Sequence, residues 1–332
     1  MSVIKRRTVF SGILFTLLCL YPPDVGAAMV PDYEKQEGCV YLSGRTVFFD
    51  DQDYVLRWRL RGRPADGSAF CLEVIQGRGV VIRQVFPPPI RVSDGALLET
   101  SLRYPKIREC LRIQGCIRVY PLAEGSCSDP LFYQPVVWVS REWKGDFGHE
   151  SMRNQLGTVG VDSGSGLWQV LLDMGLQPVQ VGDLASFPGR WLICSGQSLH
   201  RDTSLFERLL DRAERGADIL VLPPFSGSIP LPGFRPRMRF ATQDACPFSP
   251  LPPWGKGRSA GGIAFGIFSG ESAALRFDDE GKGYAWAEWC FQRGVMYLGT
   301  GVAVGEDGSD PSARMLINDW ICHEEGGCHV RE

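Results

Sequence analysis

Polar side chains able to contact a ligand follow three short apolar runs in the second half of the sequence, at 159–161, 191–194 and 219–222. Runs of this length and composition are typical of strands that are buried on both faces of a parallel sheet. The carboxyl ends of parallel strands meet at one edge, and sheets of this kind bind their ligands there. We therefore predict a ligand site formed by the side chains that follow the runs, namely Asp162, Ser163, Ser165, Gln197 and Ser226.

A nucleophile and a base also lie close together around the second run. Cys194 or Ser195 has the chemistry of a nucleophile, and His200 has that of a general base. Such a pair needs a third group to orient the base, and Asp202 is the candidate for that role. The turn at 163–166 lacks the spacings of phosphate-binding loops, which favours a plain tight turn over an anion site. We predict no catalytic site here. If the edge of the sheet is catalytic, the candidate residues are Cys194, Ser195 and His200.

One tryptophan lies where it could contact a sugar. Trp254 belongs to the proline-rich segment 252–257, from which its indole could stack on a sugar or on a partner protein. The alternative is a structural role, because large aromatic side chains are mostly buried on average. If a tryptophan of this chain binds carbohydrate, Trp254 is the candidate.

The amino end of the sequence has the pattern of a secretory leader over residues 1–28. Basic residues at 5–7 precede an apolar stretch at 9–21, and small residues then offer a cleavage site before Ala28. The apolar stretch is short for a membrane-spanning helix, and an uncleaved anchor is the alternative. We expect a periplasmic or secreted protein that contacts a membrane, if at all, through an uncleaved leader.

The number of cysteines fits an oxidising compartment. Eleven cysteines, less the one in the leader, leave an even number that is compatible with disulfides. We predict two short-range pairs, Cys110 with Cys116 and Cys322 with Cys328, because glycines between the members let the chain turn back. Histidines beside the second pair supply the residue types of a zinc site, but their adjacency to the cysteines gives awkward geometry and favours a disulfide. We predict no metal and no cofactor.

The composition narrows the classes of partner. Hydrophobic residues make up 44% of the chain and charged residues 22%, as in packed globular proteins. A formal net charge of −3 argues against a general nucleic-acid binder. The arginines that alternate over 57–63 are interpreted as a solvated sheet face. We therefore expect an envelope protein or a glycan as the partner, and no nucleic acid.

Residues 35–142 have the pattern of an antiparallel β-sandwich of immunoglobulin type. Apolar and polar residues alternate over 55–60, and turn signals separate this strand from the ones that follow it. The prolines at 87–89 mark a connection or an edge, because proline cannot lie in a central strand. The further predicted strands are 70–76, 80–86, 96–102, 111–120 and 135–140.

The second half of the chain alternates strands with helices. A linker is expected at 143–157, an α/β domain at 158–323 and a tail at 324–332. Ser204 and Glu207 have the spacing of a capping box at the start of one helix, and Pro311 opens the last helix behind an Asp310 cap. The order of these elements indicates a doubly wound parallel sheet.

Over residues 157–322 the chain resembles the class I glutamine amidotransferase-like superfamily, in particular its non-catalytic trehalose-utilisation-like and β-galactosidase-trimerisation-like domains. The resemblance rests on the order of the elements and on three segments: Leu192-Ile193-Cys194-Ser195-Gly196, the helix and strand at 205–222, and the segment 294–301 before the last helix. It implies a flavodoxin-like fold.

The resemblance also implies a test for activity. Active members of the superfamily carry a nucleophilic cysteine in a G-x-C-x-G turn directly after the strand that 219–222 matches here. In this sequence Pro223 and Pro224 follow that strand, and two prolines do not form the tight turn that presents a nucleophile. Cys194 belongs to an earlier strand and does not replace the missing nucleophile.

These features together predict an exported, non-enzymatic protein that serves binding or assembly in the cell envelope. One alternative is a hydrolase that acts on carbohydrate or envelope material in the cleft at the carboxyl ends of the strands. Another alternative is a carbohydrate-binding module.

Overall fold

The computed structural model describes residues 38–325 apart from 44, 63, 66, 110, 123–129, 149–151, 153–154, 224, 226, 232–237, 242–261, 269–271, 279–283 and 300–310. The predicted leader therefore lies outside the described residues. The chain is a mixed α/β protein made mostly of sheets. The described residues belong to one compact unit.

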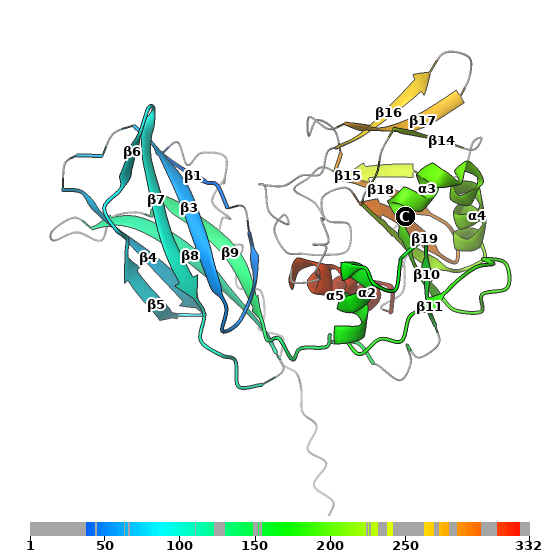
Figure 1. The fold of residues 1–332 in the computed structure, drawn as a ribbon, viewed down its shortest axis with the longest axis horizontal. Helices are drawn as coiled ribbons and strands as arrows, with labels where there is room; N and C mark the ends of the chain where they lie inside the picture. Colours follow the sequence, from blue (N-terminus) through cyan, green and yellow to red (C-terminus); the bar gives the residue numbers. More distant parts are fainter. Residues whose placement is uncertain are drawn as a thin grey trace, which may run out of the picture. The chain divides into compact units, whose positions relative to one another are not determined.

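Two facing sheets occupy the first part of the described chain (Figure 1). The first sheet has the order β1-β3-β7-β6 and is antiparallel throughout: β1 (Cys39–Tyr41), β3 (Asp53–Arg61), β7 (Gly95–Arg103) and β6 (Ile90–Val92). The second has the order β2-β9-β8-β4-β5: β2 (Val47–Phe49), β9 (Phe132–Val139), β8 (Arg112–Leu122), β4 (Ala69–Gln76) and β5 (Gly79–Val85). In this second sheet β2 runs parallel to β9, which differs from the purely antiparallel arrangement predicted.

Alternation along the strands explains why these two sheets pack together. In β3, Leu56, Trp58 and Leu60 are buried in a core to which both sheets contribute. The intervening arginines are exposed and pair with acids, Arg57 with Glu99 and Arg59 with Asp94. The prediction of a solvated arginine face is confirmed for these two residues.

A third sheet, larger than the first two, forms the centre of the α/β part. Its order is β11-β10-β12-β13-β19-β18-β15; the first five strands are parallel, and β18 and β15 are antiparallel to their neighbours. The strands are β10 (Leu156–Val159), β11 (Val179–Gln180), β12 (Trp191–Ser195), β13 (Asp218–Leu222), β15 (Met238–Ala241), β18 (Trp286–Cys290) and β19 (Val295–Gly299). A small antiparallel sheet adds β14 (Ser228–Pro230), β17 (Ser272–Asp278) and β16 (Gly262–Phe268).

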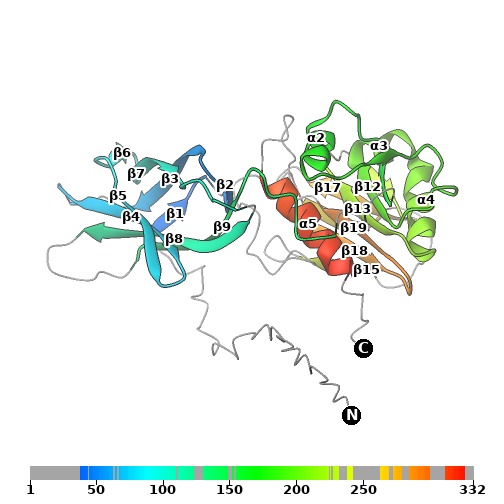
Figure 2. The ribbon, with the colours of Figure 1, turned by 90° about the horizontal axis from the view of Figure 1, so that it is seen from below.

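Helices cover both faces of the larger sheet. Ile193 and Leu220 belong to the core cluster that includes α2 (Gly166–Asp173) and α5 (Pro311–Glu325), whereas their neighbours Leu192 and Ile219 belong to the cluster under α4. The strands lie between α5 and α4 in Figure 2. The remaining helices are α3 (Gly196–Arg201) and α4 (Thr203–Glu214).

Some predicted boundaries are wrong for local reasons. The strand predicted at 159–161 ends at Val159, because Gly160 has a positive φ of 63° and turns the chain. The predicted capping box at Ser204 does not start its helix: the Asp202 side chain accepts a hydrogen bond from the Ser204 N–H, so the N-cap of α4 lies two residues before Ser204. The expected linker also contributes buried side chains, among them Trp143 and Phe147.

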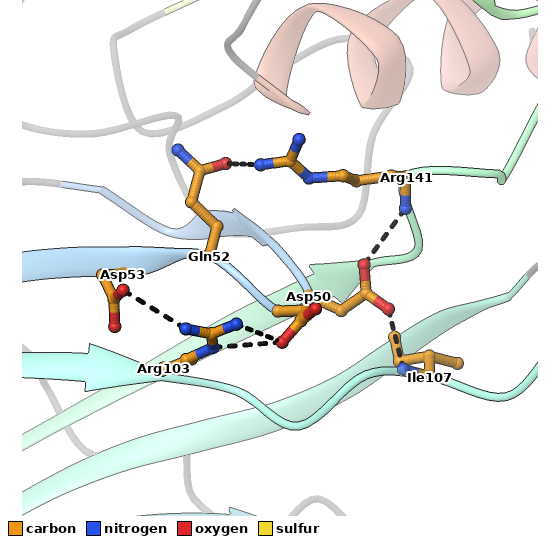
Figure 3. A network of polar contacts seen from close by, with 7 residues as sticks. Asp50, Gln52, Asp53, Arg103, Ile107 and Arg141 are labelled. Atoms are coloured by element: carbon orange, nitrogen blue, oxygen red, sulfur yellow. Dashed lines mark hydrogen bonds and ion pairs between the residues drawn. The ribbon is translucent and has the colours of Figure 1, made fainter.

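The turn between β2 and β3 is tied to two other segments of the sandwich (Figure 3). The Asp50 carboxylate is almost fully buried and accepts hydrogen bonds from the backbone N–H of Ile107, at 2.7 Å, and of Arg141, at 3.1 Å. Beside it, the Arg103 guanidinium pairs with Asp51 and lowers the pKa of that carboxyl. These bonds fix the chain where it leaves β9 for the α/β part.

Helix α5 packs on β2 and on the segment that follows β9. Met315 is fully buried in an apolar cluster with side chains from both strands and from the segment after β9: Val47, Phe49, Val137, Val139 and Trp143. A helix of the α/β part thus completes a core that begins in the sandwich.

A buried arginine fixes this contact. Arg314 pairs with Asp173 at 2.8 Å and donates to the backbone C=O of Arg141 at 2.9 Å, with its guanidinium 5.0 Å from the centre of the Phe49 ring. Burial lowers the pKa of Arg314, and the Asp173 carboxylate opposes that effect. The charge is thus held in place by one carboxylate, one aromatic ring and two carbonyl groups, since the guanidinium also donates to the backbone C=O of Trp143 at 3.5 Å.

A second set of polar contacts lies one turn further along α5. Arg112 of β8 pairs with Asp319 and with Asp146, each at 2.9 Å. The Asn318 side chain accepts a hydrogen bond from the Asp146 N–H at 2.7 Å. Since Asn318 and Asp319 are buried, these contacts satisfy polar groups that would otherwise destabilise the junction.

We predict that Arg314→Met lowers the free energy of unfolding by about 1–3 kcal/mol, because it removes a buried guanidinium that pairs with the exposed Asp173 and leaves a carbonyl group without its donor. Urea unfolding followed by circular dichroism measures this change. Arg59→Met is the matched control, and it should change stability by less than about 0.5 kcal/mol because Arg59 is exposed. Equal effects of the two substitutions would contradict the role assigned to Arg314.

Candidate functional site

The candidate site lies at the carboxyl edge of the parallel strands. The chain leaves β10 for α2 on one face of the sheet, and it leaves the neighbouring strand β12 for α3 and α4 on the other face. Adjacent parallel strands whose connections run to opposite faces leave a crevice between their carboxyl ends, which is where such sheets bind ligands. The predicted residues after β10 and β12 flank this crevice.

The residues after β10 form a turn that starts a helix. The C=O of Asp162 accepts a hydrogen bond from the Ser165 N–H at 2.9 Å, and Ser165 Oγ accepts one from the Trp168 N–H at 3.2 Å. Ser165 is therefore the N-cap of α2, which agrees with the interpretation of this segment as a tight turn. Asp162 and Ser163 are exposed at the surface.

Cys194 lies in the core rather than at the edge. Its thiol is fully buried among the side chains under α4 and donates to the Ser195 C=O at 3.5 Å. Burial raises the pKa of this thiol to about 12, so it stays protonated at neutral pH. A protonated thiol is a poor nucleophile, and this one is out of reach of solvent.

Helix α3 carries the other predicted edge residues. Ser195 is half-buried at its N-cap, and Gln197 and His200 are exposed. A Cβ placed on Gly160 would fall 1.6 Å from Ser198 Oγ, and one on Gly227 would lie 3.8 Å from His200 Cε1. The structure thus brings α3 between the turn after β10 and the segment after β13.

The predicted contact between the His200 base and an orienting carboxylate of Asp202 is not formed. Asp202, the carboxylate expected to orient His200, instead accepts hydrogen bonds from Ser204 and from Arg208. These two contacts lower the pKa of Asp202, the one from Ser204 more strongly. Asp202 therefore acts as a helix cap and as the partner of an arginine.

Several predicted residues fall on parts of the chain without a described position. Ser226, Trp254, Cys110 and Cys328 lie outside the described residues. Cys116 is buried in β8, and the Cys322 thiol contacts the Asn318 side chain at 3.8 Å. Both predicted disulfides stay predictions, because one member of each pair is not described.

A groove beside α4 was not predicted from the sequence. Its volume is about 470 Å³, and it is lined by residues 181–185, by Ser198 and Arg201 of α3, and by the face of α4 that carries Leu205, Arg208 and Arg212. We call it the α4 groove. Since 181–185 follow β11 and α3 follows β12, the α4 groove reaches the same carboxyl edge as the crevice. Its volume is within the range of small-molecule sites.

The charged groups of the α4 groove are held in fixed positions. Arg208 pairs with Asp202 at 2.6 Å and also donates to Ser204 Oγ at 3.1 Å. Arg212 donates to the backbone C=O of Phe187 at 2.8 Å and of Gly189 at 2.9 Å. Bonds of this kind hold the two guanidinium groups in place before any ligand arrives.

Asp183 faces Arg208 from the opposite wall of the α4 groove. The pKa of its carboxyl is lowered, first by the Ala185 N–H and by Ser186, and also by the charge of Arg208. Asp183 is therefore ionised at neutral pH. For the α4 wall the sequence carried one signal, the arginines at 208, 212 and 215, which recur with the period of one helix face.

The described part of the chain contains no group of three His, Cys, Asp or Glu side chains placed to hold a metal ion. Within the same residues, no helix combines the length and the apolar character needed to cross a membrane.

No family model matches the chain, and no curated protein matches it either. Several solved structures are distantly similar, and three of them are described below. The first is EndoBT-3987 of Bacteroides thetaiotamicron with a Man5GlcNAc product, at 9% identity over 54% of this chain and 51% of that chain, with a TM-score of 0.22. The second is a cycloisomaltooligosaccharide glucanotransferase of Paenibacillus sp. complexed with cycloisomaltoheptaose, at 9% identity over 71% and 33%, with a TM-score of 0.23.

The third is the Bifidobacterium dentium beta-glucuronidase complexed with coumarin-3-O-glucuronide, at 10% identity over 56% of this chain and 44% of that chain, with a TM-score of 0.20. The chain matches from a third to about half of the length of these three proteins. TM-scores this low do not establish a common fold.

We predict that iodoacetamide does not label Cys194 in the folded protein and labels it readily in urea, because the buried thiol is protonated and shielded from solvent. Peptide mapping by mass spectrometry measures the fraction of each cysteine that is alkylated. Cys290, which is partly buried and belongs to no predicted disulfide, is the internal comparison and should be labelled faster than Cys194. Rapid labelling of Cys194 in the native protein would show that its burial is not maintained in solution.

Proposed function

We propose that this protein is an exported, non-enzymatic binding or assembly protein of the cell envelope. In this proposal the α/β part is a degenerate amidotransferase-like, flavodoxin-like domain, and the sandwich is of immunoglobulin type. The protein binds a ligand or partner at the carboxyl edge of the parallel strands. None of its cysteines acts as a catalytic nucleophile on that ligand.

The observation that carries the proposal is the position of Cys194. A thiol with no exposed surface and a pKa of about 12 is a core group. A cysteine, the nucleophile of active superfamily members, is therefore present near the edge, but its thiol is neither ionised nor accessible. Pro223 directly after β13 further supports the proposal, because a proline there is unsuited to the turn in which active relatives carry their nucleophile.

The arrangement of the sheet supports a binding role at the edge. Parallel strands with helices on both faces leave a crevice between β10 and β12, and the predicted residues Asp162, Ser163, Gln197 and His200 are exposed beside it. Exposed polar groups on rigid elements can hold a ligand without reacting with it.

Export is tested by expressing the full chain with a carboxyl-terminal tag and sequencing the mature amino end. We predict that the protein leaves the cytoplasm and that its sequence begins at or near Ala28. Replacing Leu14 and Leu17 together by Arg interrupts the apolar stretch, so the variant should stay in the cytoplasm at full length. Full-length protein in the cytoplasm for both forms would contradict export.

The proposed absence of enzymatic activity is tested by incubating the protein with purified envelope glycans and peptides. Mass spectrometry detects any products. We predict no turnover by the wild-type chain above the level of a Ser195→Ala, His200→Ala double variant. Turnover that this double variant or Cys194→Ala abolishes would overturn the proposal and favour a hydrolase that uses the same edge.

A further inference from the structure

We propose that β5 is the docking edge for an extended, acidic segment of a partner protein, which adds a strand to the second sheet of the sandwich. The segment forms backbone hydrogen bonds with Arg83 and Val85 and places a carboxylate beside the Arg83 guanidinium. This inference goes beyond the proposed function, because it concerns a surface of the sandwich and not the carboxyl edge of the parallel strands.

The backbone of β5 has a free side. This strand is the outermost one of its sheet (Figure 1), and among the described strands it pairs with β4 alone. The Phe86 N–H donates to the Phe70 C=O at 2.9 Å, so it points toward β4. In an antiparallel pair this direction alternates from one residue to the next. The N–H and C=O groups of Val85 and Arg83 therefore point away from β4, and none of the described residues bonds to them.

The free side has the length of a short peptide. The register of β4 and β5 shifts between Val74 and Ile75, and prolines follow β5 at 87–89. Bulges and prolines interrupt strand pairing, so the regular part of this edge runs from Ile82 to Phe86. A segment of about five residues spans it, at about 3.4 Å per residue. The interruptions disfavour open-ended pairing between whole sheets and leave room for a short segment.

The other edges of the sandwich are shorter. Among its described strands, β1, β2 and β6 also lie at edges; each has three residues, and α5 packs on β2. Short or covered edge strands are a common protection against unwanted pairing. In contrast, β5 has seven residues and exposes the side chains of Val80, Val81 and Val85, the last of them by 57%. This edge thus offers apolar contact area beside its free backbone groups.

The charges of the β4–β5 hairpin favour an acidic segment. Glu73 is buried, whereas Arg78 is exposed and the side chain of Arg83 is 67% exposed. Arg83 pairs with the Glu73 carboxylate through Nε, at 2.7 Å, and through Nη2. None of the described residues accepts a hydrogen bond from Nη1 of Arg83, so these N–H groups stay available for a second carboxylate. The accessible charge is positive, and a negative segment complements it.

A second copy of the chain fits this edge less well. In a two-fold antiparallel pair along the regular edge, Arg83 lies opposite either Arg83 or Val85 of the other copy. Both registers bring the two Arg83 side chains to the same face, directly or diagonally adjacent, where like charges repel. An acid opposite Arg83 and an apolar residue opposite Val85 replace this repulsion with attraction. The expected segment therefore carries an acid and an apolar residue two positions apart.

The test is amide hydrogen exchange of the mature protein, measured by NMR with a blocked heptapeptide in which threonines alternate with valine, glutamate and valine. We expect the Arg83 and Val85 amides to exchange about tenfold more slowly when the free peptide is at about ten times its dissociation constant, because only the unbound fraction exchanges. The peptide with lysine in place of glutamate should bind about tenfold more weakly, since it loses one charged pair.

Methylated peptides test the backbone hydrogen bonds on the wild-type protein. Residues directly opposite Arg83 and Val85 turn their N–H groups toward β5, and the residues between them turn theirs away. Methylation of the valine and glutamate nitrogens should therefore abolish binding. Methylation of the same number of threonine nitrogens is the matched control and should preserve it.

A variant of the protein tests the same bonds from the other side. Val85→Pro removes an N–H that points away from β4, a position at which an edge strand tolerates proline, and it should weaken binding about tenfold or more. Val85→Thr keeps the N–H and should bind the peptide like the wild type. Circular dichroism checks that both variants are folded, and the methylated peptides decide the question if Val85→Pro is not.

Three results would overturn the inference. They are unchanged exchange at Arg83 and Val85 with the peptide, equal binding of the glutamate and lysine peptides, and a dimer that protects these two amides in the absence of peptide. The proposed function stands after any of them, because its site is the carboxyl edge of the parallel strands. Turnover of a glycan or peptide substrate overturns the proposed function and leaves the role of β5 unchanged.

Discussion

The central strands β12 and β13 must be covered on both faces, and the rest of the α/β part follows from that constraint. Every residue from Trp191 to Cys194 and from Asp218 to Leu222 is buried, so neither face of these strands can be left to water. Each buried apolar side chain of this size favours the folded state by about 1.5–3 kcal/mol. Helices α2 and α5 on one face and α4 on the other are the elements that provide the cover.

The same constraint decides what the functional groups near these strands can do. Cys194 is on a strand face that α4 covers, so its thiol becomes a core group. Asp218 enters β13 from the opposite end, where burial raises the pKa of its carboxyl and Arg190, at 2.6 Å, opposes that shift. Polar groups stay accessible only where the strands end, and the exposed residues of the turn after β10 and of α3 lie there.

Prediction from the sequence was successful where a pattern was long enough to repeat. The alternation over β3 and the position of Pro311 at the start of α5 agree with the structure. Strands of three residues, such as β1, β2 and β6, are too short to show a period of two, so they were missed. Strand β15, of four residues, was also missed.

The candidate site was predicted only in part. The order of strands and helices was enough to indicate the carboxyl edge, because the geometry of parallel strands fixes that edge whatever the side chains are. The α4 groove depends on how residues 181–185 pack against a helix that follows them by some twenty positions. No local pattern encodes such a contact, and the arginines of α4 alone resemble the solvated side of any amphipathic helix.

The position of α5 along the chain has a consequence for how the protein reaches its native state. Its residues complete the apolar cluster of β2 and β9 and also cover one face of the larger sheet, yet they come after all the other described elements. Neither sheet can be sealed while α5 is still unsynthesised. During that interval a wide apolar surface is open to water, and a chaperone that recognises extended chains would have most of its opportunity to bind then.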